Sequence, residues 1–228
     1  MATSGAVTLE YTVSELIEEA YERAGYDLQF LNAHHMRTAR RSMNLMFSDW
    51  ANSGVRLWMV DNQTQTVTAS TASYTLPAGT IDVLSAVLSR SSVVTPMVRI
   101  SREDFHYIPN KTQEGRPDRF FLDRQLSQPV MHVWQTPENS TDVIDYWRLV
   151  RMDDVTRGTE TADIPQRWWE AMCAGLAVKL WQKLPLEKRR PQDLQALGVL
   201  ALDAFKNARS EDRERAPSSF TPYAGYGI

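Results

Sequence analysis

The spacing of apolar residues changes once, near residue 53, and this change limits the folds open to the chain. Between residues 32 and 52 apolar side chains recur every three or four positions, which predicts an amphipathic helix. Its apolar face comprises Met36, Ala39, Met43, Met46, Phe47 and Trp50. Ser53-Gly54 ends this helix, because glycine adopts the left-handed cap conformation without cost. The short apolar segment 56–60, the alternating Thr-rich segment 64–70 and residues 73–77 then indicate a β region.

A shorter helix is predicted before this one. Thr12 and Glu15 have the spacing of a capping box, in which the two side chains bond free backbone N–H groups at a helix start. Apolar residues then repeat at helical spacing as far as Gly25, with Glu18, Glu19 and Glu22 off the apolar face. Because the link 26–31 is short, we expect the two helices to pack as an antiparallel hairpin.

The middle of the chain, residues 56–152, has the pattern of an antiparallel β region. Short runs rich in branched and aromatic residues alternate with turn residues, which favours a small sandwich or open barrel. The expected strands include 81–89, 93–100, 118–123, 130–134 and 143–152, with a turn at Ser91-Ser92 and a capped helical turn beginning at Ser101.

Two further helices follow a polar link at 153–162. Pro165 suits a first helical position, and a wide apolar stripe runs from Trp168 to Leu184. A last helix is expected from about Pro191, with a face made of Leu194, Leu197, Leu200, Ala201, Ala204, Phe205 and Ala208. Two prolines and two glycines from Pro217 onward exclude a helix there.

The predicted fold is therefore α+β. It is a helical bundle of about four helices with an antiparallel β domain inserted between the second and third, followed by an extended C-terminal tail. The expected boundaries are 1–55 and 160–216 for the bundle, 56–159 for the β domain, and 217–228 for the C-terminal arm.

Composition argues against several classes of protein. The formal net charge of −3 over 228 residues is unlike the basic excess of a general nucleic-acid binder. A single cysteine, Cys173, indicates a reducing compartment. The first eight residues lack the basic and apolar regions of a signal peptide, and no apolar run approaches the roughly 20 residues of a membrane span.

Motifs that carry chemistry are missing from the sequence. It has no phosphate-binding glycine loop and no nucleophile motif of the G-x-S-x-G type. His34 and His35 are adjacent on a helix and point about 100° apart, so they do not share a metal ion easily. We therefore expect no catalysis, no metal and no cofactor.

Three groups of residues are candidates for contacts with partners. Arg37, Arg40 and Arg41 lie on one side of the second helix, where they would touch either phosphate or a neighbouring subunit. Four tryptophans belong either to a subunit interface or to the core: Trp50, Trp168, Trp169 and Trp181. The tail residues Phe220, Tyr223, Tyr226 and Ile228 would either anchor in a partner's groove or fold back on their own domain.

Several segments together resemble a known family. They are Ala20 to Gly25, Ser42 to Trp50 with Leu57-Trp58, Ser73 to Pro77, Ile81 to Leu84, and Pro165 to Trp169. The pattern is similar to the head-to-tail adaptor (connector, or tail tubular) proteins of short-tailed bacteriophages, and it covers about residues 12–210. It consists of packing and turn residues and includes no catalytic motif.

The resemblance implies a structural protein of the virion, made in the host bacterial cytoplasm. Such adaptors form a ring, usually of twelve subunits, beneath the portal. The helical bundle lies against its neighbours and the portal, the β region faces the tail nozzle, and DNA passes through the lumen without sequence-specific binding. In some members a C-terminal tail reaches into the portal, which here would be residues 217–228. Two alternatives stay open from the residues alone: a regulatory module that binds nucleic acid through Arg37, Arg40 and Arg41, and an enzyme on an inserted-domain scaffold.

Overall fold

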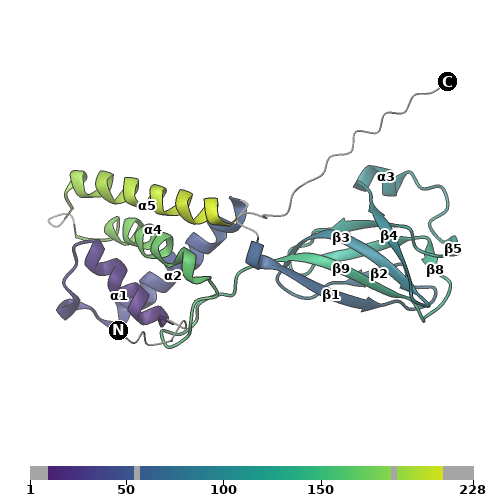
Figure 1. The fold of residues 1–228 in the computed structure, drawn as a ribbon, viewed down its shortest axis with the longest axis horizontal. Helices are drawn as coiled ribbons and strands as arrows, with labels where there is room; N and C mark the ends of the chain where they lie inside the picture. The colour runs from purple at the N-terminus through teal and green to yellow at the C-terminus, as the bar shows by residue number, and fades with distance from the viewer. Residues whose placement is uncertain (1–9, 54–56, 186–188, 213–228) are drawn as a thin grey trace, which may run out of the picture.

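The chain has helices at one end and strands at the other (Figure 1). A computed structural model describes residues 10–53, 57–185 and 189–212. Two helices come first in the chain and two come last, and the strands lie between them. The α+β class and the insertion of the β region between the second and third helices of the bundle are therefore confirmed.

The first helix, α1 (Val13–Arg23), starts as the sequence predicts. The Thr12 side chain accepts from the backbone N–H of Glu15, and the Glu15 carboxylate accepts from the Thr12 N–H at 2.7 Å. The helix ends where Gly25 adopts a positive φ of 78°. After a short 3₁₀ turn, η1 (Leu28–Phe30), α2 (Ala33–Asn52) begins at the cap residue Asn32.

The expected apolar face of α2 is buried except at Met36, which is half-buried. The expected hairpin of α1 and α2 is only a minor contact, because both helices pack mainly against α4 (Trp169–Trp181). That helix is apolar almost all round, so it buries more surface against each neighbour than α1 and α2 bury against each other.

The second helical pair consists of α4 and α5 (Pro191–Glu211), the latter with a proline in its first turn. A 3₁₀ turn, η3 (Gln166–Trp168), precedes α4. Pro165 caps that turn with an extended ψ of 148°, so it stands before the helix and is not its first residue. This corrects the predicted start of the third helix by four residues.

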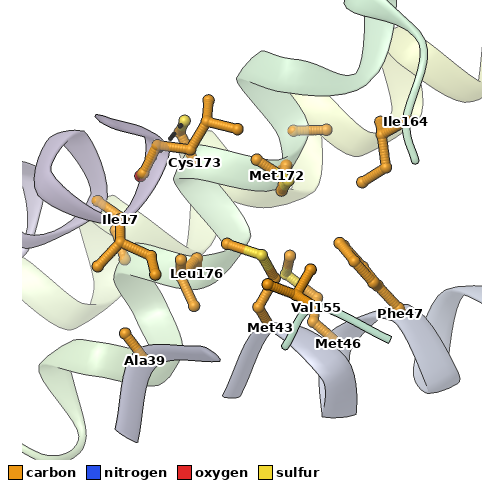
Figure 2. Packing of buried hydrophobic residues seen from close by; sticks show 14 of the residues in the cluster. Ile17, Ala39, Met43, Met46, Phe47, Val155, Ile164, Met172, Cys173 and Leu176 are labelled. Atoms are coloured by element: carbon orange, nitrogen blue, oxygen red, sulfur yellow. Dashed lines mark hydrogen bonds between the residues drawn. The ribbon is translucent and has the colours of Figure 1, made fainter. Parts of the chain in front are cut away.

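Helix α4 is the centre of the main core. Met172, Cys173 and Leu176 lie among side chains from α1 and α2, such as Ile17, Ala39 and Met43 (Figure 2). Val155 and Ile164, from the segment expected to be a polar link and from just after it, also enter this core.

The link crosses the bundle in close contact with both N-terminal helices. Asn44 on α2 donates to the Val155 carbonyl at 3.3 Å and accepts from the Val155 N–H at 3.0 Å. The N–H of Ser14 donates to the carbonyl of Gly158 at 2.9 Å. A Cβ on Gly158 would collide with Ser14 Oγ, so glycine allows this close approach.

The sequence predicted β structure from residue 56, but Leu57–Met59 form a 3₁₀ turn, η2, and the first strand begins at Val60. The strands of the β region are β1 (Val60–Thr66), β2 (Ser73–Thr75), β3 (Thr80–Arg90), β4 (Val93–Arg99), β5 (Glu114–Gly115), β6 (Arg119–Asp123), β7 (Val130–Trp134), β8 (Thr136–Pro137) and β9 (Val143–Val150). A short helix, α3 (Arg102–His106), has the predicted cap at Ser101. The predicted turn is also confirmed, with positive φ values of 48° at Ser91 and 69° at Ser92.

Seven strands form one sheet in the order β1-β9-β3-β4-β6-β7-β2. Most neighbouring pairs are antiparallel, as predicted, but β4 and β6 are parallel, and so are the two short strands β5 and β8. β4 and β6 are parallel because α3 and the loop after it return the chain to the end of the sheet at which β4 begins. Parallel neighbours need such a crossover connection. Side chains from both halves of this sheet enclose a second core: Tyr74, Leu76, Val83, Leu88, Phe120, Leu122, Met131, Ile144 and Tyr146 are among its members.

Candidate interaction surfaces

The described residues form no metal centre or membrane span. No group of three or more metal-binding side chains comes together within residues 10–53, 57–185 and 189–212. No helix in this part of the chain is long and apolar enough to cross a bilayer. Burial raises the pKa of the Cys173 thiol to about 11, so this cysteine carries little thiolate at neutral pH. The remaining candidates for function are surfaces that other molecules could contact.

The three predicted arginines line a hollow with a volume of about 500 Å³. Arg37, Arg40 and Arg41 of α2 line it together with Val155 and Thr156 of the link. The hydrogen bonds between Asn44 and Val155 hold the link against α2. The geometry therefore brings together all three arginines, as their helical spacing predicts.

The positive charge of this hollow is not neutralised within the described part of the protomer. Arg37 Nε donates to the carbonyl of Ala33 at 3.3 Å, and none of the three arginines has a described carboxylate within 4 Å. The pKa of Lys183 nearby is lowered, first by burial and then by the charges of Arg41 and Lys179. The partial positive charge at the start of α2 has the same sign. An anionic partner would relieve this repulsion.

A second charged surface lies on α1, where the side chains of Glu15, Glu18, Glu19 and Glu22 are exposed. Glu15 serves the helix cap, and its hydrogen bonds from the backbone and side chain of Thr12 lower its pKa. Glu19 accepts from Arg23 Nε at 2.7 Å, and the same guanidinium forms two bonds to Glu170, at 2.6 and 2.9 Å. Glu18 and Glu22 have no described ion pair. Sequence reasoning placed Glu18, Glu19 and Glu22 off the apolar face and Glu15 in the helix cap. It did not count these glutamates as a site, although their spacing of three and four residues was the available signal.

Three of the four predicted tryptophans belong to the core of the protomer. Trp168 is fully buried, and its ring lies 5.2 Å from that of Trp50 and 5.4 Å from that of Phe205. Trp181 is also buried, with 7% of its surface exposed. Trp169 is half-buried and packs edge-on against Tyr11 at 5.1 Å. An inter-subunit role of these tryptophans stays a prediction, and Trp169 is the most accessible of them.

The predicted tail anchors, Phe220, Tyr223, Tyr226 and Ile228, lie outside the described residues. Their role as anchors in a partner therefore stays a prediction.

Helix α5 presents apolar side chains that the described residues leave exposed. Leu200, which the sequence assigned to the packed face, is 62% exposed, and Val199 and Leu202 are also more than half exposed. The packed face is narrower than predicted because α5 contacts α4 on one side only, so Leu200 lies beyond the contact. Beside Leu202, an apolar groove of about 380 Å³ runs between α2, α4 and α5.

Comparison with known proteins identifies the family to which the chain belongs. No curated protein matches the chain. The model of the family described as SU10 adaptor protein matches residues 11–223, which include almost the whole helical bundle and all of the β region. A match over this length shows that the chain belongs to the SU10 adaptor protein family, a family of phage head-to-tail adaptors.

Proposed function

We propose that the protein forms a ring of twelve subunits that joins the phage portal to the tail nozzle and leaves a channel for DNA. The observation that carries this proposal is the family match over residues 11–223, which makes the protein a structural adaptor of a phage. The ring, its copy number and its two partners extend that assignment. In this proposal the protein is made in the cytoplasm of the host bacterium and functions in the virion, during DNA ejection.

The arrangement of the chain supports a molecule with two different binding ends. Helices α1, α2, α4 and α5 gather at one end, and the strands gather with the short helix α3 at the other, as Figure 1 shows. We assign residues 1–55 and 160–216 to the end that meets neighbouring subunits and the portal, and residues 56–159 to the end that meets the nozzle. The C-terminal arm, 217–228, would bind the portal through Phe220, Tyr223, Tyr226 and Ile228.

The family of structural adaptors implies a protein without catalysis. A buried thiol with a raised pKa and carboxylates committed to caps and ion pairs are consistent with such a role. The adaptor as proposed requires neither a cofactor nor a metal.

The test is assembly on the portal ring from the same source. Full-length protein and a version ending at Ala216 would each be mixed with this portal, sedimented and imaged by negative-stain electron microscopy. We expect the full-length protein to add a stacked ring and the shortened protein to fail. Binding by both versions would show that the helices, and not the arm, make the portal contact. Binding by neither, at any salt concentration, would contradict the adaptor function.

The arginine-lined hollow supports one second candidate, a module that binds nucleic acid. Contacts of Arg37, Arg40 and Arg41 with phosphate would give a DNA affinity that falls as salt rises. A titration of labelled duplex DNA at low and physiological salt tests this, with Arg37→Glu/Arg41→Glu as the matched variant. The adaptor proposal predicts weak binding that disappears at physiological salt.

A further inference from the structure

We propose that the arginine-lined hollow on α2 receives the acidic face of α1 from the next copy of this chain. This inference rests on the proposed ring and names the surfaces through which its subunits meet. The basic surface consists of Arg37, Arg40 and Arg41, and the acidic surface of Glu18 and Glu22 with their neighbours Glu15 and Glu19.

Charge complementarity is the first argument. The hollow holds three guanidinium groups without a described carboxylate partner, and the N-terminal end of α2 adds positive potential. The exposed side of α1 carries four glutamates within three turns, of which Glu18 and Glu22 have no described ion pair. Opposite charges on two separate faces of one chain favour a contact between copies, because the two faces do not meet within the protomer.

The spacing of the charges is the second argument. Glu18 and Glu22 are four residues apart on one helix, and Arg37 and Arg41 are four residues apart on the other. Each pair therefore spans about 6 Å along its helix axis. Two helices that lie side by side could form both ion pairs at once. Such a contact joins two different surfaces, and a repeated contact of this kind closes into a ring when the rotation fits.

Other acidic side chains of the chain fit the hollow less well, because many have partners in the protomer. Asp49 pairs with Lys179, Asp142 with Arg90, and Asp154 with Arg151. Among the described helices, α1 is the one that combines several exposed glutamates on a single face. A second copy of the chain is therefore the occupant that the charges favour.

The experiment uses two oppositely reversed full-length chains. Arg37→Glu/Arg41→Glu makes both faces acidic, and Glu18→Arg/Glu22→Arg makes both faces basic. All four side chains are exposed, so we expect both variants to fold. Circular dichroism and thermal melting check this directly.

We expect each reversed chain alone to need at least about tenfold more protein for assembly than the natural chain, because like charges then face each other. An equimolar mixture of the two should assemble again, with the two chains alternating around the ring. Assembly would be measured by sedimentation velocity and native mass spectrometry, alone and on the portal ring. A chain with Arg102→Glu/Lys111→Glu at the β end, where both side chains are exposed, has the same change in net charge as Arg37→Glu/Arg41→Glu and should assemble normally.

The outcomes separate this inference from the proposed function. If the natural chain assembles but the reversed chains also assemble alone, or if their mixture fails while both are folded, the proposed interface is wrong and the adaptor function stands. If Arg37→Glu/Arg41→Glu loses DNA affinity but assembles normally, the hollow binds phosphate and the proposed interface is likewise wrong. If the natural chain never joins the portal ring, the proposed function itself fails.

Discussion

The helical and β ends of the molecule are stabilised in different ways. The helical core surrounds α4, whose buried side chains are almost all apolar. The β end instead includes charged groups in its interior: Asp142 is fully buried and accepts three bonds from Arg90, and Arg148 is 91% buried and donates to Thr80 at 2.8 Å and to Asp61. Removing one partner of a buried charge pair leaves the other charge uncompensated, whereas truncating a buried apolar side chain leaves a cavity. The β end should therefore be sensitive to the loss of single charged groups, and the helical end to the loss of buried apolar volume.

The largest effect is expected in the helical core. Trp168→Ala removes a fully buried ring in contact with Trp50, Trp58 and Phe205, so it should cost about 3–5 kcal/mol of unfolding free energy. Urea denaturation followed by the circular dichroism of the helices measures this. Trp168→Phe is the control and should retain most of the stability. An Ala variant as stable as the natural protein would show that this ring is not central to the core.

A smaller effect is expected when a buried charge of the β end loses its partner. Arg90→Met leaves the Asp142 carboxylate buried without its guanidinium, which should cost about 2–4 kcal/mol. The matched change, Glu138→Gln, removes only the exposed side of the same network and should cost less than about 1 kcal/mol. Equal costs for the two variants, measured by the same denaturation, would refute the role assigned to the buried pair.

The link between the two ends provides an intermediate test. Asn44→Ala removes both hydrogen bonds to Val155 and leaves its buried N–H unpaired, for a cost of about 1–2 kcal/mol. Hydrogen exchange should increase at Val155 and Thr156 and remain unchanged in β3 and β9. Faster exchange in the sheet as well would mean that the two ends unfold as one unit.

The smallest effect concerns an exposed ion pair on the helical end. Arg23 lowers the pKa of the Glu170 carboxyl below its ordinary value of 4.5. The stability from this pair is therefore present above the unfolded-state pKa and is lost as pH falls through the folded-state pKa. Glu170→Gln should cost less than about 1 kcal/mol at pH 7, and the difference should shrink as pH falls below the ordinary carboxyl pKa of 4.5. A difference that stays constant as pH falls would point to packing and not to charge.

The sequence predicted the helices and most strands because their apolar periods are local properties. The caps at Thr12 and Ser101 and the turn at Ser91-Ser92 follow from side chains close to each other in the chain. It was harder to predict which strands pair and which helices pack against each other. The parallel pairing of β4 with β6 depends on the path of a long loop, and the packing of α1 against α4 depends on how much surface α4 offers.

Surfaces were predictable in part. The spacing of Arg37, Arg40 and Arg41 indicated one face, and the structure places them around one hollow. The position of Val155 in the lining of this hollow was not predictable, because a single apolar residue in a polar segment carries no periodic signal. Tryptophans at helical spacing indicate a face but do not say whether that face is covered by the same protomer, and Trp168 and Trp181 are covered.

The measurement that tests the central claim most directly is native mass spectrometry of the full-length protein mixed with the portal ring of its phage. The proposed function predicts a complex heavier than the portal by twelve copies of this chain, with little portal left free. A spectrum in which the portal keeps its own mass at all protein concentrations and salt conditions would contradict the account.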